Sequence, residues 1–312
     1  VGDLPYAALG QNIFDAEWDE PADTSISPKT VARLGEAITT YPEDIKPHGR
    51  VKRIMDDRVK MMKGEIDMDW GFAETMAYAS LLAEGHPVRL TGQDAERGTF
   101  SHRHLVIHDV ETGREVAPLQ QVGDARLEVY NSPLTEMGVI GFEYGYSVGS
   151  DTDVVLWEAQ FGDFVNVAQP IIDQFITSAE GKWGMLSGLV MLLPHGFEGM
   201  GPEHSSARLE RFLQLAAEDN LQIANPTTPA QLFHLLRRQV WRHWRKPLVM
   251  FSPKSLLRHP DCVSSLDELT EGAFAQWGYQ VAKERFADRT ISEAELYDAY
   301  DGRRPEDKVV IK

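Results

Sequence analysis

The sequence predicts one doubly wound α/β domain with a mostly parallel β-sheet, from about residue 69 to 258. Two observations lead to this fold class: short, nearly all-apolar runs recur along the chain, and longer stretches with helical patterning lie between them. Strands covered on both faces are continuously apolar, and strands that alternate with helices favour a parallel sheet. The 312 residues, with a 42% apolar share, can bury a sizeable core.

Residues 1–68 are predicted to form a polar, mostly helical lead-in. Ser27 and Pro28 have the pattern of an N-cap followed by proline at the first helical position, so a helix is expected to continue through Ile38. A second helix with a weak apolar stripe is expected over residues 51–62. Nothing in this segment points to chemistry, and we expect it to pack on the larger domain as a linker.

The predicted α/β domain begins with a helix and continues in alternation. Asp69 can cap a helix over residues 70–84, and a strand at 87–91 follows it directly. Further strands are expected at 105–107, 127–130, 154–157, 189–193, 221–224 and 248–251, and helices at 135–147, 165–179, 205–218 and 229–244. This alternation is typical of βαβ units, in which parallel strands are joined by crossover helices.

The end of the chain has a weaker pattern. Residues 259–312 are expected to form an incomplete or divergent extension with one amphipathic helix at 281–286. The single cysteine, Cys262, excludes an internal disulfide framework and suits a reducing compartment. The chain begins without Met, so we expect a fragment or a processed product.

The acidic composition restricts the expected partners. The formal net charge is −17, with acidic residues spread along the chain. Such a surface repels phosphate backbones and anionic lipid, so we expect no nucleic-acid partner and no membrane partner. No apolar run approaches the length of a membrane span. An anionic substrate would need a local cluster of His, Arg or backbone donors.

Four predicted loops at strand ends carry polar or aromatic residues that could form one site. In chain order these are Arg97, His102 and His104 in the loop 92–104, Glu136 at the start of a helix, Phe161 and Phe164 after the strand at 154–157, and His204 in the glycine-rich loop 194–206. Doubly wound sheets bind ligands at the carboxyl ends of their strands. Each loop alone fits an ordinary structural role, but together they predict a small anionic ligand at this edge of the sheet.

Three histidines are candidates for metal ligands. His102, His104 and His108 alternate in sequence, and alternate residues of a strand share one face. No carboxylate or cysteine stands at a spacing that completes the ligand set, so we expect no metal ligands in this chain. The sequence also lacks the dinucleotide fingerprint, a Walker loop and a Gly-x-Ser-x-Gly motif.

Several motifs in these loops are long and unusual. They are Gln-Asp at 93–94, Arg-Gly-Thr-Phe at 97–100, Arg-His at 103–104, Trp-Glu-Ala-Gln-Phe-Gly-Asp-Phe at 157–164, Leu-Pro-His-Gly at 193–196, Gly-Pro-Glu-His-Ser-Ser-Ala-Arg at 201–208 and Ser-Pro-Lys-Ser-Leu-Leu-Arg at 252–258. With these motifs in uninterrupted order, residues 30–274 resemble the 2-oxoglutarate dehydrogenase E1 component family. The resemblance implies a transketolase-like pyrimidine-binding domain with thiamin diphosphate as cofactor.

The resemblance also implies which residues bind the cofactor. Glu136 corresponds to the family glutamate that hydrogen-bonds the aminopyrimidine ring nitrogen. A carboxylate suits that role because it must share a proton with a weakly basic nitrogen in a dry site. Phe161 and Phe164 correspond to the aromatic pair that flanks the ring.

The implied reaction is the oxidative decarboxylation of 2-oxoglutarate, with transfer of the succinyl group to a lipoyl group on the E2 component. His204 and His104 correspond to histidines that line the reaction centre, where they bind the 2-oxo acid or stabilise intermediates. His102 and Arg97 are further implied substrate contacts. The cofactor carries the hard chemistry, and the protein positions and polarises it.

The sequence departs from the family in what it lacks. Family members bind the diphosphate through Mg²⁺ on a separate domain with a Gly-Asp-Gly motif, and here Gly123-Asp124 and Gly162-Asp163 lack the third glycine. We therefore expect half of an active site, inert alone, that needs a diphosphate-binding domain or subunit to hold Mg²⁺. The other expected partners are the E2 dihydrolipoamide succinyltransferase and a second copy in a homodimer. The expected location is a bacterial cytoplasm or a mitochondrial matrix.

Two alternatives stay open from the sequence. One is an E1 component for another 2-oxo acid such as 2-oxoadipate, which the loop around His104 would decide. The other is a catalytically silent α/β module kept for assembly. The joint presence of Glu136, Phe161, Phe164 and His204 argues against the silent module, which has no chemical need for all four.

Overall fold

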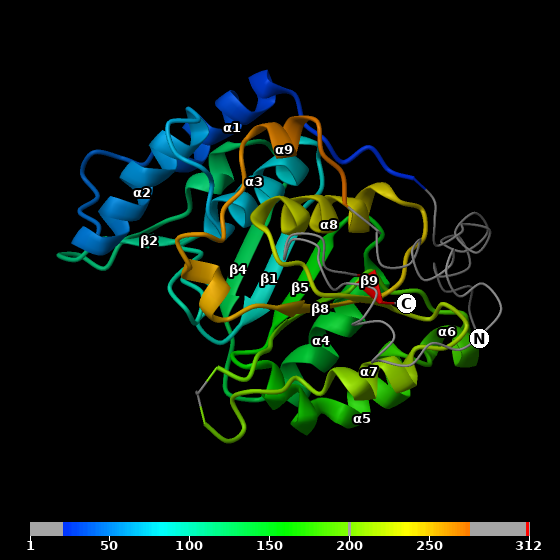
Figure 1. Cartoon of the computed structure of the whole chain (residues 1–312). Helices are drawn as coiled ribbons and strands as arrows, with labels where there is room; N and C mark the ends of the chain where they lie inside the picture. Colours follow the sequence, from blue (N-terminus) through cyan, green and yellow to red (C-terminus); the bar gives the residue numbers. More distant parts are fainter. Residues whose placement is uncertain (1–20, 199–200, 275–309, 312) are drawn as a thin grey trace.

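The computed structural model describes residues 21–198, 201–274 and 310–311 and is built around one large sheet (Figure 1). In spatial order its strands are β4 (Leu127–Asn131), β1 (Val88–Gly92), β5 (Val154–Glu158), β6 (Val190–Pro194), β8 (Leu248–Ser252), β7 (Gln222–Ala224) and β9 (Val310–Ile311). Neighbouring strands are parallel from β4 to β7, and β9 runs antiparallel to β7. The predicted fold class, a doubly wound and mostly parallel sheet, is confirmed.

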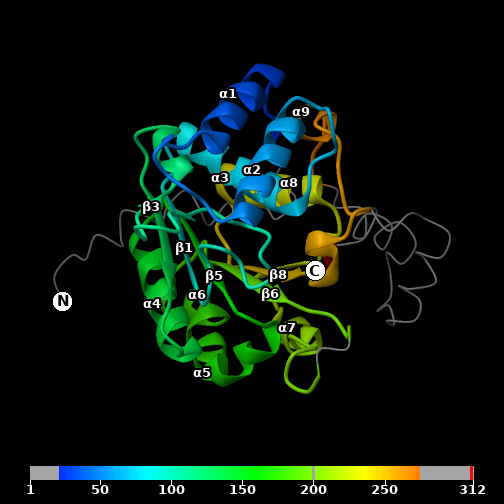
Figure 2. The same ribbon diagram turned by 90° about the vertical axis from the view of Figure 1, so that its left-hand side faces the viewer.

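Helices cover both faces of the sheet (Figure 2). One layer holds α1 (Pro28–Thr39), α2 (Gly49–Met62), α3 (Trp70–Ala83), α8 (Pro229–Trp241) and α9 (Asp267–Thr270), and the other holds α4 (Glu136–Gly149), α5 (Gln169–Ile171), α6 (Ala179–Trp183) and α7 (Leu209–Leu215). The two larger apolar clusters of the described residues lie on opposite faces of the sheet, because alternate strand residues such as Leu156 and Trp157 point to opposite faces. Among the helices described, none combines the length and the apolar character that crossing a membrane requires.

The helices before the sheet begin as the sequence predicts. The Ser27 hydroxyl accepts a hydrogen bond from the Thr30 backbone N–H at 3.1 Å, and the Asp69 carboxylate accepts one from the Phe72 N–H at 2.7 Å. Both bonds satisfy orphan donors of a helix start. α3 is buried on nearly all sides, which explains its all-round apolar sequence. Leu34 of α1 joins the same apolar cluster, so the lead-in packs on the domain as expected.

The expected strand at 105–107 is not part of the main sheet. The structure instead has a short hairpin of β2 (Ile107–His108) and β3 (Glu115–Val116). Leu105 donates its backbone N–H to Glu96 O at 2.8 Å, so this segment is tied to the preceding loop before any strand can begin. A short apolar run in the sequence does not distinguish a strand from a buried loop. In this segment, backbone hydrogen bonds to the preceding loop favour the loop conformation.

Two expected helices are shorter or broken. The predicted helix at 165–179 is a succession of a 3₁₀ turn, α5, a π-helical turn at Ile172–Ile176 and then α6. Pro170 lacks a backbone donor, so α5 begins anew with proline in its first turn. The predicted helix at 205–218 is reduced to α7, because Ala207 donates its N–H to His195 Nδ1 at 3.0 Å. Side-chain acceptors thus compete with the helix for backbone donors. The expected helix at 281–286 lies outside the described residues.

Gly71, in the first turn of α3, marks the closest approach between this helix and the loop that follows β1. A Cβ atom built on Gly71 would lie 1.9 Å from the His102 carbonyl oxygen. We expect Gly71→Ala to lower the free energy of unfolding by about 3 kcal/mol, because two backbone segments must separate. Gly181→Ala on α6 is the matched control: its Cβ would meet nothing within 4 Å. It should stabilise the protein by about 0.5–1 kcal/mol. Urea unfolding measures both, and equal effects would contradict the close approach.

Candidate active site

The parallel strands bring the predicted site residues to one edge of the sheet. Gly92, the last residue of β1, pairs in register with Asn131 of β4 and Glu158 of β5. The loops that follow these three strands are therefore neighbours. The Gln93 side chain, just after β1, donates a hydrogen bond from Nε2 to Glu136 Oε1 at 3.1 Å. The strand register therefore brings the loop after β1 against the start of α4.

Glu136 is the first residue of α4 and lies half-buried at the helix start. Thr135 caps this helix by accepting a hydrogen bond from the Gly138 N–H at 3.4 Å, and the positive end of the helix dipole favours an anion at Glu136. The space beside Glu136 is lined by Gln93 and Gln160 and has no room for a water molecule. Within the described residues, Glu136 is thus supported from one side and not enclosed by a ring-sized cavity.

Phe161, Phe164 and His204 form a cluster of rings in the loops after β5 and β6. The ring centroid of His204 lies 4.6 Å from that of Phe161 and 5.3 Å from that of Phe164, both edge to face. His204 Nδ1 lies 2.7 Å from the Pro202 carbonyl oxygen. A carbonyl only accepts, so Nδ1 carries the proton in the neutral ring and Nε2 keeps its lone pair. The cluster therefore presents an apolar surface with one proton-accepting nitrogen.

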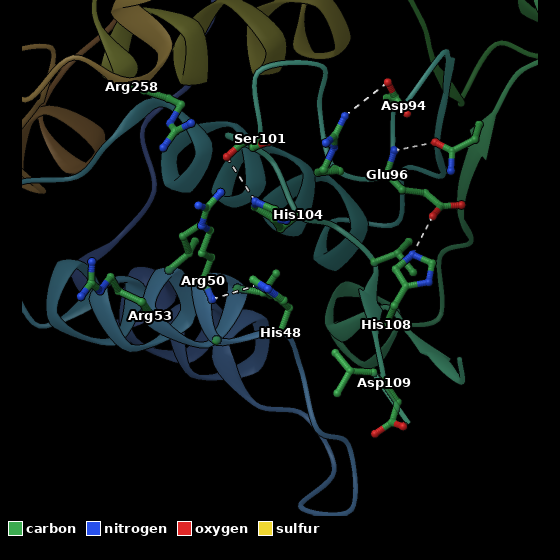
Figure 3. Close-up of a pocket in the computed structure, with 17 residues that line it drawn as sticks. His48, Arg50, Arg53, Asp94, Glu96, Ser101, His104, His108, Asp109 and Arg258 are labelled. Atoms are coloured by element: carbon green, nitrogen blue, oxygen red, sulfur yellow. Dashed lines mark hydrogen bonds and ion pairs between the residues drawn. The ribbon is translucent and has the colours of Figure 1, made fainter. Parts of the chain in front are cut away.

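His104 and Arg97 line a different space, an open cavity of about 1000 Å³ (Figure 3). His104 has φ of 50° and is held by its backbone N–H, which donates to Arg97 O at 3.2 Å. Its Nε2 donates to the Ser101 carbonyl at 3.1 Å. Burial lowers the pKa of His104 to about 4, and the nearby Arg58 and Arg97 charges act in the same direction. The ring is therefore neutral near pH 7.

His102 lies beneath this loop rather than in the cavity. Its side chain is buried, its Nε2 lies 3.7 Å from Glu74 Oε2, and its Nδ1 has no hydrogen-bond partner in the described part of the chain. Burial and the neighbouring Arg103 hold the pKa of His102 well below its ordinary value. The structure thus brings Arg97 and His104 to one cavity and places His102 behind them.

A buried ion network supports the loop, and we did not predict it from the sequence. Arg103 is fully buried between two carboxylates: Nη2 lies 2.9 Å from Glu74 Oε1 and 2.6 Å from Glu158 Oε1. Glu74 belongs to α3 and Glu158 ends β5, so one side chain joins three elements. The available signal was an acid inside an apolar helix and another at the end of an apolar strand, since buried charges need partners.

The three alternating histidines do not gather around a common point in the described structure, and the single cysteine is buried. In the part of the chain that the structure describes, no three His, Cys, Asp or Glu side chains gather as a metal-ligand set. His108 is half exposed and pairs with Glu96 at 3.0 Å, away from the buried His102. The Cys262 thiol is buried, and burial raises its pKa to about 11, so it is not a nucleophile at neutral pH.

Comparisons with known proteins agree with this geometry. The family model for the transketolase pyrimidine-binding domain matches residues 67–260. The 2-oxoglutarate dehydrogenase E1 component of Cupriavidus necator is 55% identical over 275 residues, which cover 86% of this chain and 29% of that protein. Those of Coxiella burnetii and Haemophilus influenzae are 54% and 55% identical, over 86% and 83% of this chain. The chain spans less than a third of the length of these relatives.

Arg103 should be far more important for stability than its position in a polar loop suggests. We expect Arg103→Met to lower the free energy of unfolding by about 3–5 kcal/mol, because Glu74 and Glu158 would remain buried without a cation. The loss should be smaller near pH 5 than near pH 8. Burial already raises the pKa of Glu158, and without Arg103 it rises further. Between the unfolded and folded pKa values the folded state binds more protons, so stability falls as pH rises.

The matched control is Arg126→Met, since Arg126 is 60% exposed and pairs with Glu128 at the surface. Its effect should stay below about 1 kcal/mol. Urea unfolding of both variants at the two pH values measures the difference. A loss of unfolding free energy in Arg103→Met that does not change with pH would contradict the explanation that Glu74 and Glu158 are left buried without a cation.

His104 should stay neutral across the physiological pH range. We expect its imidazole to titrate with a midpoint near its pKa of about 4, measured from the ring resonances by NMR. Arg97→Gln should raise this midpoint, because a like charge is removed, whereas Arg33→Gln on the exposed face of α1 should leave it unchanged. A midpoint at the ordinary histidine value of about 6.5 would contradict the burial of this ring.

Proposed function

We propose that this chain forms the pyrimidine-binding half of a 2-oxoglutarate dehydrogenase E1 active site. The premise is that the chain belongs to the transketolase pyrimidine-binding domain family. The observation that carries the proposal is the position of Glu136. It stands at the start of α4 beside Gln93, at the same sheet edge as the loop with Phe161 and Phe164. The identity to named E1 components, about 55% over most of the chain, supports 2-oxoglutarate as the substrate.

The residues fit a thiamin pyrimidine. Gln93 donates a hydrogen bond to Glu136 Oε1, and no described residue donates one to Oε2. Glu136 Oε2 is therefore free to share a proton with a ring nitrogen. Phe161 and Phe164 offer flat apolar faces of the kind that pack on an aromatic ring. When bound, thiamin diphosphate supplies the electron sink for decarboxylation. Because Glu136 is open on one side, we assign the diphosphate and Mg²⁺ to a partner domain.

The histidines and Arg97 are assigned to the 2-oxo acid. Neutral His104 exposes the Nδ1 lone pair, and His204 keeps the lone pair of Nε2, so both rings can accept a proton or a hydrogen bond at the reacting centre. Arg97 is about half exposed and can turn from Asp94 towards a carboxylate. His102 lies behind His104, so its contribution to substrate binding is to support the loop from below.

The remaining parts of the proposal concern the whole enzyme. The active protein includes a diphosphate-binding domain or subunit, pairs with a second copy, and passes the succinyl group to an E2 dihydrolipoamide succinyltransferase. The named relatives are bacterial, which supports the bacterial cytoplasm over the mitochondrial matrix. This chain alone is expected to have no decarboxylase activity.

A chimera tests the proposal. The matched segment of the Cupriavidus necator E1 component is replaced by this chain, and 2-oxoglutarate decarboxylation and thiamin diphosphate binding with Mg²⁺ are measured. We expect activity and calorimetric binding in the chimera and neither in the chain alone. Glu136→Gln should lower turnover by about 10²–10⁴-fold without changing urea unfolding, because the carboxylate can no longer share its proton.

Glu36→Gln, on the exposed face of α1, is the matched control and should keep full turnover. A folded chimera that binds no thiamin diphosphate would favour the silent module. Turnover that Glu136→Gln leaves unchanged would remove Glu136 from the site. Comparison of 2-oxoglutarate with 2-oxoadipate in the same assay decides between the two substrates.

A further inference from the structure

The cavity that contains His104 carries more positive charge than the proposed function uses. This space, called here the arginine pocket, measures about 1000 Å³ and is bounded by the first turns of α2, the loop after β1 and the 3₁₀ turn after β8. Its titratable lining residues are His48, Arg50, Arg53, Asp94, Glu96, Arg97, His104, His108, Asp109 and Arg258. Figure 3 shows Arg258 reaching towards the space from the side opposite to Arg50 and Arg53.

The acids of the arginine pocket already have partners. Asp94 pairs with Arg97 at 3.3 Å and accepts a hydrogen bond from Gln160 at 3.1 Å. Glu96 pairs with His108 at 3.0 Å. The Asp109 carboxylate accepts hydrogen bonds from the backbone N–H groups of Lys46, Glu111 and Thr112. Each of these carboxylates keeps its charge, but its hydrogen-bond or ion-pair partners are other groups than Arg50, Arg53 and Arg258.

In the described part of the chain, three guanidinium groups have neither a hydrogen-bond partner nor an ion-pair partner. Among the residues that the structure describes, the side chains of Arg50, Arg53 and Arg258 make neither a hydrogen bond nor an ion pair. A cluster of three arginines is unexpected in this acidic protein, which has 48 acidic and only 31 basic residues. The start of α2 also faces the pocket, so the positive end of its dipole adds to the same field.

We propose that the arginine pocket binds a small organic anion with at least two phosphate or carboxylate groups. Each guanidinium group can form a bidentate pair with one such group, and three of them on α2 and beyond β8 call for several charges on one ligand. A pocket of this volume lies at the upper end of small-molecule sites. Val51, Ile54, Val106 and Val110 also line it and give its carbon part apolar surface.

The ligand acts on the loop that carries Arg97 and His104, the residues assigned above to the 2-oxo acid. Ser101 and His104 form the inner wall of the pocket, so an occupant touches the loop that carries a candidate reaction-centre histidine. Arg258 and Arg97 also act on the charge state of His104. An anion that pairs with Arg258 therefore changes the electrostatic surroundings of His104. This inference goes beyond the proposed function and needs no thiamin diphosphate.

Isothermal titration calorimetry on the chain, with tripolyphosphate and citrate as probes at constant ionic strength, tests the proposal. We expect saturable binding of one probe per chain with a dissociation constant of about 1 mM or tighter. Tighter binding of tripolyphosphate identifies a phosphate ligand, and tighter binding of citrate identifies a polycarboxylate. Arg53→Gln and Arg258→Gln should each weaken binding by about tenfold or more, since each removes a charge-assisted hydrogen bond.

Arg33→Gln, an exposed arginine on α1 outside the pocket, is the matched control and should change affinity by less than about twofold. The pocket variants should keep wild-type urea unfolding, because their guanidinium groups make no hydrogen bond or ion pair among the described residues. In NMR spectra the probe should shift the ring resonances of His48 and His104, but not those of His234, which is buried between Thr24 and Glu268.

Several results would overturn the proposal. These are no saturable binding of either probe, an equal loss of affinity in Arg33→Gln, or unshifted His48 and His104 resonances at saturation. Loss of binding in the chimera, with binding kept in the isolated chain, would show that the pocket receives an acidic segment of the rest of the enzyme. Each result is independent of decarboxylation, so it leaves the proposed function untouched.

Discussion

Arg103 and the two carboxylates around it are the interaction on which the rest of the site depends. Glu74 lies in the middle of a buried helix, and Glu158 ends a strand with buried residues on both sides. Taking either carboxylate out of water without a cation would cost several kcal/mol, so the loop that brings Arg103 is bound to α3 and β5 together. The next residue is His104, whose strained backbone conformation is held by that anchored loop.

The parallel sheet explains why residues far apart in the sequence meet. Every βαβ crossover returns the chain in the same direction, so the loops after β1, β4, β5 and β6 open at one edge. The Gln93–Glu136 hydrogen bond and the ring cluster of Phe161, Phe164 and His204 lie on that edge. They offer a surface rather than an enclosed pocket, which suits an active site completed by another domain.

Electrostatics divides this edge into two parts. Around Glu136 the surroundings include Gln93, Gln160 and Trp157. Around His104 they are cationic, and burial together with arginine charges keeps the ring neutral. A protein with a net charge of −17 thus concentrates positive charge where an anionic substrate or effector would arrive. The arginine pocket extends that field beyond the reacting centre.

The sequence alone determined the layers of the fold and the chemical types at the site. The all-apolar run at 154–157 forms a strand covered on both faces, and Asp69 and Thr135 begin helices through hydrogen bonds within a single turn. Loop motifs also marked Glu136, Phe161, Phe164 and His204 as candidate site residues, and the family resemblance supplied the roles predicted for them. Local signals failed at 165–179, where Pro170 lacks a backbone donor, and at 205–218, where the Ala207 backbone N–H donates to the His195 side chain.

Only the tertiary structure decided which charges are paired and which are free. His102 and His104 are two residues apart, yet one is sealed against Glu74 and the other faces a cavity. Arg103 meets carboxylates 29 and 55 residues away, and Arg258 joins a pocket with Arg50 and Arg53 from the other end of the chain. No periodicity encodes such meetings, because burial and long-range charge pairing depend on distances that exist only after the strands have assembled.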